Sequence, residues 1–132
     1  MKIGRSTGYA LLAMAYIAQD KTKKSLSSRD VSKQYDIPLE YLLKILQQLV
    51  KANLLYSKRG PSGGFTLAKQ ADKITVLQII EAVEGPMANP LSLAELAPNA
   101  KIGARADKVF AKAAAQTKAV YSQTKLSSLI TK

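Results

Sequence analysis

The sequence contains no cysteine and no histidine among its 132 residues. Without these side chains the chain has no disulfide, no thiolate nucleophile, no imidazole acid or base, and no zinc site of the usual kinds. No apolar run reaches the roughly twenty residues that a membrane-spanning helix needs. We therefore expect no transmembrane segment and no catalysis of the common nucleophilic or zinc-dependent types.

Acidic residues are also scarce, because nine Asp and Glu stand against twenty Lys and Arg, for a formal net charge of +11. A basic excess of this size in a small chain favours polyanionic partners, of which nucleic acid and anionic membranes are the commonest. Residues 1–70 carry net +8 and residues 71–132 carry net +3. We expect a polyanion to bind the first half of a compact domain with a single core.

A short apolar stretch over residues 9–18 follows two basic residues and has the pattern of a signal peptide, with Ala13-Met14-Ala15 as its cleavage site. Cleavage there would leave too short an apolar region. The same stretch fits a buried helix over residues 6–19 that carries apolar side chains on all sides. We favour the buried helix and, with it, a cytoplasmic protein.

Residues 27–52 have the pattern of two helices joined by a tight turn. Ser27 and Asp30 have the spacing of a capping box, which predicts a short helix from near Ser28 to about Tyr35. Pro38 suits the first turn of the next helix, where its missing N–H needs no partner. Leu43 lies at the edge of the apolar stripe and could face either way. The inward residues are Leu39, Leu42, Ile45, Leu46 and Leu49, and the outward ones are Glu40, Tyr41, Lys44, Gln47, Gln48 and Lys51.

Between Leu54 and Leu67 two short strand-like runs are joined by a basic, glycine-rich turn. Lys58 and Arg59 lie at the approach to Gly60-Pro61-Ser62-Gly63-Gly64, whose glycines permit positive φ angles and close approach of the backbone to a phosphate. A groove-binding helix beside such a hairpin is the arrangement of a winged helix-turn-helix. The sequence therefore predicts a mainly α fold with a small β-hairpin wing, as a DNA-binding domain over residues 1–85.

The early residues of the second helix lie nearest to base edges in a helix-turn-helix. Glu40 can accept from a cytosine amino group, Lys44 can donate to guanine or a phosphate, and Tyr41 can bind a phosphate through its hydroxyl. Arg59 can enter a narrow minor groove. A surface helix or a hairpin alone would be unremarkable, but the two together favour DNA. The predicted DNA-binding residues are Ser28, Pro38, Glu40, Tyr41, Lys44, Lys51, Lys58, Arg59, Gly60, Ser62 and Gly63.

The segment after the hairpin predicts one more helix of the domain and then a connector. Thr75 and Gln78 have capping-box spacing, Ile74 and Ile79 can form a hydrophobic staple, and the helix ends at Gly85. Residues 86–99 contain three prolines, so we expect a connector with at most two turns of helix. It ends near Asn99, which we expect to cap the helix that follows.

Residues 100–132 are expected to form a long amphipathic helix, ending near residue 123, and a tail. Nothing else in the sequence is left to cover its apolar stripe, so a second subunit in antiparallel orientation is the natural cover. The alternative is that the helix folds back on its own domain. The predicted dimerisation residues are Ile102, Ala106, Val109, Phe110, Ala113, Thr117, Val120 and Tyr121.

Motifs of catalysis are weak in this sequence. The glycine-rich turn is not a P-loop, because no Lys followed by Ser or Thr comes after it. Ser122 and Lys125 have the spacing of a serine–lysine pair, and Glu81 and Glu84 lie on neighbouring helix positions, but both spacings arise often by chance. We therefore expect that the protein is not an enzyme.

Four segments, KIGRSTGYALLAMAYIA, SLSSRDVSKQYDIPLEYLLKILQQLVKANLL, SKRGPSGGFTLAK and ITVLQIIEAVEGP, resemble in order and spacing the Rrf2 family of bacterial winged-helix regulators. The resemblance is strong over residues 1–87. It implies a homodimer joined through the long C-terminal helix, which binds a pseudo-palindromic operator in double-stranded DNA, usually as a repressor. Residues 38–44 and Arg59 match DNA-contacting positions of the family, but Glu40 and Leu43 stand where relatives often have small or polar residues, so a base preference does not transfer.

Many members of this family hold an iron-sulfur cluster with three cysteines that lie between the positions of Gly85 and Lys101. This chain has no thiolate to offer, so we expect no cofactor and no metal. The resemblance implies that members without cysteines respond to a small molecule, to a protein partner or to no known effector. The connector is where we expect an effector to act, by altering the separation of the two recognition helices. A protein-interaction adaptor and a nonspecific architectural DNA-binding protein are the alternatives on the same fold.

Overall fold

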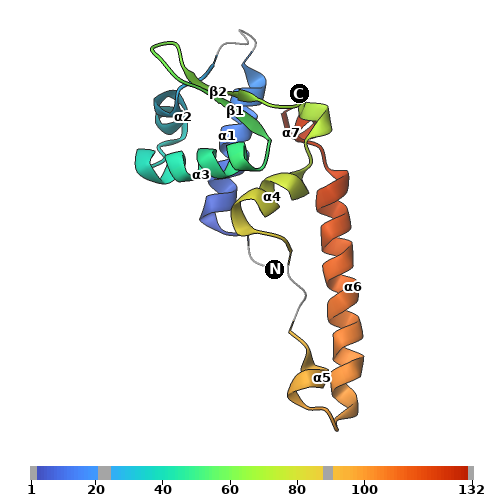
Figure 1. Ribbon diagram of the computed structural model, residues 1–132. Helices are drawn as coiled ribbons and strands as arrows, with labels where there is room; N and C mark the ends of the chain where they lie inside the picture. Colours follow the sequence, from blue (N-terminus) through green and yellow to red (C-terminus); the bar gives the residue numbers. More distant parts are fainter. Residues whose placement is uncertain (1–2, 21–24, 88–90, 131–132) are drawn as a thin grey trace.

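The computed structural model describes residues 3–20, 25–87 and 91–130. It consists of a head and a long arm that projects from the head (Figure 1). The head contains α1 (Arg5–Gln19), α2 (Ser28–Tyr35), α3 (Leu39–Lys51), β1 (Leu55–Lys58), β2 (Gly64–Leu67), the short 3-10 helix η1 (Ala71–Lys73) and α4 (Val76–Glu84). The arm contains α5 (Leu93–Leu96) and α6 (Lys101–Gln123), and α7 (Leu126–Ile130) returns to the head. This confirms the predicted mainly helical fold with a hairpin wing.

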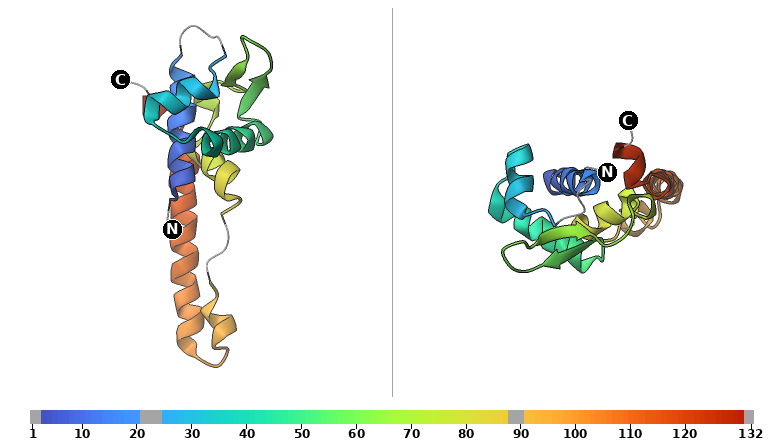
Figure 2. Two further views of the ribbon diagram at one scale, coloured as in Figure 1. Left: turned by 90° about the vertical axis from the view of Figure 1, so that its left-hand side faces the viewer. Right: turned by 90° about the horizontal axis from the view of Figure 1, so that it is seen from above.

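Helix α1 lies in the middle of the head, which confirms the predicted buried helix. Seen from above, it runs between α2 on one side and α7 on the other (Figure 2). Ala10, Ala13 and Met14 are completely buried in the core, and α1 contacts α3, α4 and α7. In the described part of the chain, no helix combines the length and the apolar character that crossing a bilayer requires.

The two helices of the helix-turn-helix begin almost where the sequence predicts. Ser27 and Asp30 form the capping box, and Asp36 closes α2 in the left-handed conformation with φ of 53°. The sequence predicts Pro38 in the first turn of α3, but Pro38 is instead the N-cap of this helix. Its ψ of 127° is extended, while its carbonyl already accepts the first helical hydrogen bond, from Leu42.

The apolar stripe of α3 packs into the core as predicted, with one exception. Leu39 is only half-buried, because the first turn of the helix lies at the edge of the core. Leu43, whose direction the sequence leaves open, is also half-buried. The residues that enter the core are Leu42, Ile45, Leu46 and Leu49.

The wing is an antiparallel hairpin in which Leu55 pairs with Leu67 and Lys58 pairs with Gly64. A third segment joins it, because Leu26 and Phe65 exchange backbone hydrogen bonds of 3.0 and 2.8 Å. No local sequence pattern predicts this bridge. It fixes the wing to the residues that lead directly into α2.

Helix α4 begins with the predicted capping box. Thr75 Oγ1 accepts from the N–H of Gln78 at 3.1 Å, and the Gln78 side chain accepts from the N–H of Thr75 at 2.9 Å. Ile74 and Ile79 are both fully buried, as the predicted staple requires. The helix ends at Gly85, which has a φ of 83°.

The far end of α6 is attached to the head of its own chain. The N–H of Val76 donates to the carbonyl of Thr124 at 2.9 Å, and the N–H of Leu126 donates to the carbonyl of Ile74 at 2.8 Å. The Leu126 side chain is fully buried. Helix α7, which no local sequence pattern predicts, therefore anchors the C-terminal end of α6, and α6 projects from the head toward α5 (Figure 1).

The connector contains one short helix, α5, within the predicted limit of two turns, while residues 88–90 lie outside the described residues. The residue that caps α6 is Ala100 rather than the predicted Asn99, and it offers no side-chain acceptor. A tight turn from α5 sets this helix start instead, since the N–H of Ala100 donates to the carbonyl of Ala97. Gly103 is buried beneath α5, where an added Cβ would lie 3.0 Å from the backbone of Ala94.

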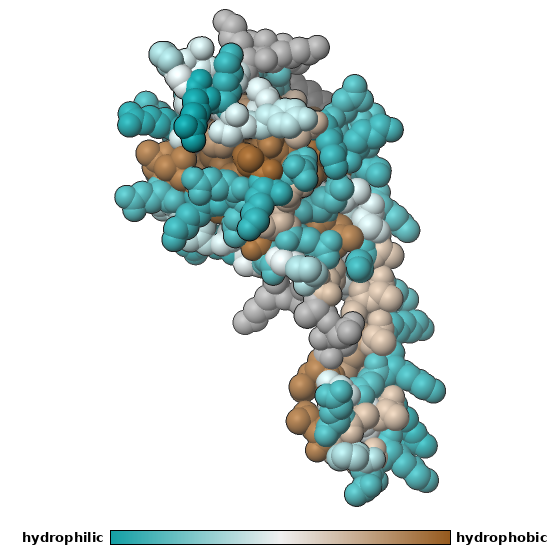
Figure 3. Space-filling view, in the orientation of Figure 1, coloured by the Kyte–Doolittle hydropathy of each residue, from teal (hydrophilic) through white to brown (hydrophobic). Residues whose placement is uncertain are grey.

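The predicted dimerisation stripe lies along α6, and its large members other than Tyr121 are exposed in the single chain. Ile102, Val109 and Val120 are each more than 60% exposed, and Phe110 is 37% exposed. The expectation that nothing in the chain covers this helix is wrong in part, because α5 packs on one end of α6 and α4 contacts it as well. Apolar residues are prominent at the α5 end of the arm (Figure 3), where Leu91 and Leu96 are exposed. The remaining stripe residues are Ala106, Thr117 and Tyr121, which are half-buried, and Ala113, which is exposed.

Candidate nucleic-acid interface

The outer face of α3 carries a row of polar side chains opposite the buried stripe. Glu40, Lys44, Gln47 and Lys51 follow one another at steps of three or four residues, so they share one side of the helix, and all are exposed. Lys44, Gln47, Gln48 and Lys51 line a shallow hollow of about 330 Å³. Amines and amides can donate to phosphates and to the base edges of a major groove. This face has the chemistry to hold a duplex.

The wing turn exposes its two basic residues, Lys58 and Arg59, directly before a tight backbone reversal. The N–H of Gly63 donates to the carbonyl of Gly60 at 2.9 Å, and Gly60 has a φ of 106°. A Cβ added to Gly63 would lie 2.3 Å from the carbonyl oxygen of Lys58. Glycine at position 63 is therefore a steric requirement of the turn that presents the two basic residues.

Glycine is also sterically required at position 64, where the wing meets the segment before α2. A Cβ at this position would lie 2.4 Å from the carbonyl oxygen of Leu26, and the φ of Gly64 is 152°. This close backbone approach allows the bridge between Leu26 and Phe65 to form. The wing therefore has a fixed place beside the helix-turn-helix.

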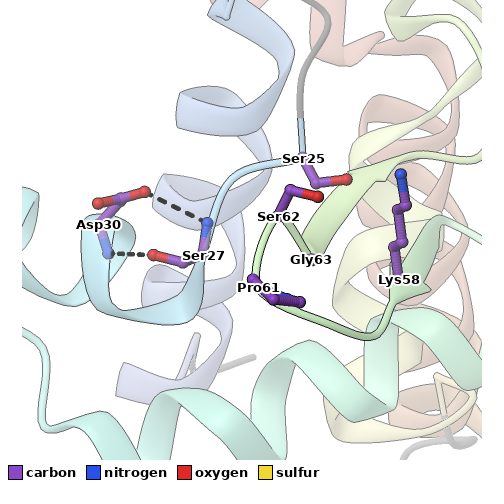
Figure 4. Close-up of a pocket in the computed structure, with 7 residues that line it drawn as sticks. All are labelled: Ser25, Ser27, Asp30, Lys58, Pro61, Ser62 and Gly63. Carbon is purple, nitrogen blue, oxygen red and sulfur yellow. Dashed lines mark hydrogen bonds between the residues drawn. The ribbon is translucent and has the colours of Figure 1, made fainter.

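A hollow of about 650 Å³ lies between the wing turn and the start of α2. In the close-up, the hydroxyls of Ser25 and Ser62 and the amine of Lys58 lie toward the same side of the opening (Figure 4). The carboxylate of Asp30 also lines the hollow, but it accepts a hydrogen bond from the N–H of Ser27 at 3.3 Å. Two hydroxyls and an ammonium group make one side of this hollow suitable for a phosphate.

The structure places the predicted DNA-binding residues on two neighbouring parts of the head, the outer side of the helix-turn-helix and the wing. All are exposed except Ser28 and Gly63, which are half-buried. Tyr41 differs from the expectation in one respect, since its hydroxyl already forms a hydrogen bond with the hydroxyl of Ser6 on α1. Its ring also packs edge-to-face on Tyr9, with 5.6 Å between ring centroids.

Sequence reasoning leaves three residues out of the site. Gln47 and Gln48 are expected to face outward, and their three- and four-residue steps from Lys44 and Lys51 could have assigned them to the same hollow. Ser25 has no such signal. It reaches the wing only because the next residue, Leu26, pairs with Phe65, a contact across almost forty residues of sequence.

A protein-family model covers almost all of this sequence. The model of the Rrf2 family, described as an iron-dependent transcriptional regulator, matches residues 3–132. The chain belongs to the Rrf2 family.

Relatives of this Rrf2 family chain are named as transcriptional regulators and not as enzymes. It is 40% identical over 86 residues to the HTH-type transcriptional regulator IscR of Cereibacter sphaeroides, an alignment that covers 64% of this chain and 56% of that protein. It is 37% identical over 84 residues to IscR of Vibrio atlanticus, with 64% and 49% covered. The chain thus spans about half the length of the curated relatives that it matches.

A solved structure extends the likeness to the arm. CymR, the global cysteine regulator of B. subtilis, superposes with a TM-score of 0.83 at 26% identity, and the match covers 98% of this chain and 96% of that one. The arrangement of the head and the long helix in this Rrf2 family chain is therefore shared, over 98% of the chain, with the solved structure of a regulator.

The iron in the description of the Rrf2 family does not fit the donor atoms of this chain. Iron-sulfur clusters are held by thiolates or, less often, by imidazoles, and the sequence contains neither. Among the described residues, no group of three or more Asp and Glu side chains could hold a metal ion. At the junction of the connector and α6, the carboxylate of Asp107 is occupied by hydrogen bonds within the protein.

Asp107 joins α6 to the start of α5. Its carboxylate accepts from the N–H of Leu93 at 2.8 Å, the N–H of Ala94 at 3.1 Å and the hydroxyl of Ser92 at 3.0 Å. These bonds, above all those from the backbone of Leu93 and Ala94, hold the pKa of Asp107 below its ordinary value. The charged carboxylate therefore takes the role of a helix cap for α5, supplied by a different helix.

Replacing Asp107 with Asn should release α5 from α6. An amide has one acceptor oxygen instead of two, and its NH₂ group would face backbone donors. We expect faster hydrogen exchange at the amides of Leu93 and Ala94 near neutral pH, measured by NMR, while amides in α1 keep their protection. Asp72→Asn replaces an exposed acid of η1 and is the matched control. It should change neither the exchange at Leu93 and Ala94 nor the protection in α1.

The pH dependence of the same contact follows from the direction of the pKa shift. Because the pKa of Asp107 is depressed in the folded state, the contact is fully present above the ordinary Asp pKa of about 3.9 and is lost as the pH falls through the lower folded value. The protection of the Leu93 and Ala94 amides, which is the slowing of their exchange relative to the intrinsic rate of an unprotected amide at the same pH, should fall only in that acidic range. A loss of protection between pH 5 and pH 7 would contradict the assignment.

Proposed function

We propose that this protein is a sequence-specific, DNA-binding transcription regulator that acts as a homodimer in the bacterial cytoplasm, with repression as its usual effect and without an iron-sulfur cluster. The observation that carries the proposal is the joint exposure of the polar face of α3 and the basic wing turn on one rigidly connected head. The net charge of +8 in residues 1–70 and the regulator names of the relatives support it.

The arrangement of α6 supports a dimer. Helix α6 has 23 residues, which correspond to roughly 34 Å at 1.5 Å per residue. Each head is attached at the C-terminal end of α6, so antiparallel pairing of two such helices would place two heads at opposite ends of the pair. Half-sites on B-DNA are separated by about 34–36 Å, one helical turn. This agreement favours binding to a pseudo-palindromic operator in double-stranded DNA.

The proposal is tested by selecting duplexes that the protein binds from a random-sequence pool and then measuring two variants. Lys44→Ala should weaken binding to the selected duplex and reduce the log–log salt slope by about 0.9 for each lost phosphate contact per protomer. Arg59→Ala should weaken binding and reduce the preference for A·T-rich flanks, because a narrow minor groove attracts an arginine. Fluorescence anisotropy at several salt concentrations measures both effects.

Lys118→Ala is the matched control, since it removes one exposed Lys from α6 without touching the head. It should leave the salt slope almost unchanged. Equal affinity for every duplex with a steep salt slope would favour nonspecific architectural binding instead. Failure to bind any duplex, together with a stoichiometric protein partner, would favour the adaptor. The effector, a small molecule or a protein, is proposed to act at the connector.

A further inference from the structure

The first turn of α1 lies between the end of α4 and the start of the recognition helix. On one side, the N–H of Gly4 donates to Glu84 Oε1 at 3.0 Å. On the other side, the hydroxyl of Ser6 bonds to the hydroxyl of Tyr41. The N-cap of α1 and a residue of its first turn therefore touch two different elements, each through a directional hydrogen bond.

Tyr41 holds α3 in a different way from the residues of the core. The buried side chains of α3, such as Leu42 and Ile45, are aliphatic, and apolar contacts of this kind are non-directional. Tyr41 is the third residue of α3, is 41% exposed, and combines its hydrogen bond with a ring contact to Tyr9 at an interplanar angle of 87°. This pair of contacts restricts the rotation of the first turn about the helix axis.

That turn carries the side chains proposed to read bases. Glu40 precedes Tyr41 by one residue and Lys44 follows it by three, so a rotation of the helix at Tyr41 moves both. We propose that Ser6 and Tyr41 are positioning residues, whose hydrogen bond fixes the direction in which Glu40 and Lys44 face the DNA. This inference rests on the proposed function, and it assigns sequence discrimination, rather than overall affinity, to a contact within the protein.

The last turn of α4 extends this arrangement to the connector. Glu81 lies three residues before Glu84 in the same helix. Its Oε2 accepts from the N–H of Met87 at 3.0 Å. A displacement of the connector at Met87 therefore pulls on the same turn of α4 that holds Gly4. The contacts run from Met87 through Glu81, Glu84 and α1 to Tyr41.

The test measures the ratio of two affinities, one for a duplex selected by the unmodified protein and one for a scrambled duplex of the same composition. Ser6→Ala and Tyr41→Phe should each lower this ratio about three- to tenfold, the range of one ordinary hydrogen bond, with little change for the scrambled duplex. Ser6→Thr keeps a hydroxyl and should restore the ratio. Tyr16→Phe removes a tyrosine hydroxyl elsewhere on α1 and is the matched control.

Ser6→Ala also separates this role from a direct phosphate contact by Tyr41. If the Tyr41 hydroxyl served mainly to bind phosphate, freeing it from Ser6 would keep or raise the affinity for both duplexes. That result would overturn the inference, as would an equal loss of the ratio in Tyr16→Phe. Thermal unfolding of each variant shows whether it is folded. Tyr41→Phe removes the same hydrogen bond without altering α1, but it also removes any phosphate contact of the hydroxyl, so Ser6→Ala is the variant that decides between the two roles.

Glu84→Ala tests the hydrogen bond between Glu84 and Gly4. It should also lower the ratio of the two affinities, since it frees the start of α1. An unchanged ratio would limit the positioning role to Ser6 and Tyr41 and overturn the extension to the connector. Failure of the proposed function gives a different result, because the unmodified protein would then enrich no duplex from the pool and the inference would fall with it.

Discussion

Val109→Glu should abolish the proposed dimer and lower the affinity of the protein for a duplex selected from the random pool about a hundredfold or more. Val109 is 65% exposed on the apolar stripe of α6. In a paired helix this position would be desolvated, and a buried carboxylate without a partner is strongly unfavourable. Loss of the second head removes the effective-concentration gain of bivalent binding, which is of order 10²–10⁴. Light scattering measures the mass, and anisotropy measures the affinity.

Ala111→Glu is the control, because it introduces the same charge two residues away on the opposite side of the helix, where Ala111 is also exposed. It should remain dimeric and bind with nearly unchanged affinity. If both variants remain dimeric, the stripe is not the interface.

The absence of native cysteines allows a direct measurement of the pairing. Ala113 lies near the middle of the stripe, so antiparallel helices that cross there would bring two Ala113→Cys residues within disulfide range. Ala115→Cys, on the other side of the helix, should stay unlinked under the same oxidation. Crosslinking of Ala115→Cys instead would indicate a different helix face.

The sequence predicts the parts of this fold that depend on neighbouring residues. The capping boxes at Ser27 and Thr75 are visible because a helix start needs its acceptor three residues from the backbone donor. The buried face of α3 is visible because apolar residues recur with the helical period. The glycine-rich turn predicts the wing in the same way, from the backbone angles that glycine permits.

The parts that the sequence does not predict depend on contacts between distant segments. The bridge between Leu26 and Phe65 leaves no local pattern, and neither does the anchoring of α7 through Leu126. Asn99 is a good capping residue by type, yet the turn from α5 places Ala100 at the cap. Tyr41 has the type and position of a phosphate-binding residue, and only the fold shows that Ser6 holds its hydroxyl.

Gly64→Ala should separate the wing from the helix-turn-helix and lower the free energy of unfolding by roughly 3 kcal/mol, in the range of substitutions that force both a steric clash and a strained φ. The added Cβ would lie 2.4 Å from the Leu26 carbonyl oxygen, which is backbone and cannot rotate away. The bridge to Phe65 must therefore open, and Arg59 loses its fixed position. Operator affinity should fall more than tenfold, beyond the effect of Arg59→Ala, as measured by thermal unfolding and anisotropy.

Gly60→Ala distinguishes the clash from the backbone strain. Gly60 also has a positive φ, of 106°, but nothing lies within 4 Å of the Cβ that it would gain. Its substitution should therefore cost only the strain of the turn, roughly 1–2 kcal/mol, and the wing should stay attached through Leu26. Hydrogen exchange at the amides of Leu26 and Phe65 reports the bridge directly, and protection that survives in Gly64→Ala would show that the wing does not depend on this close approach.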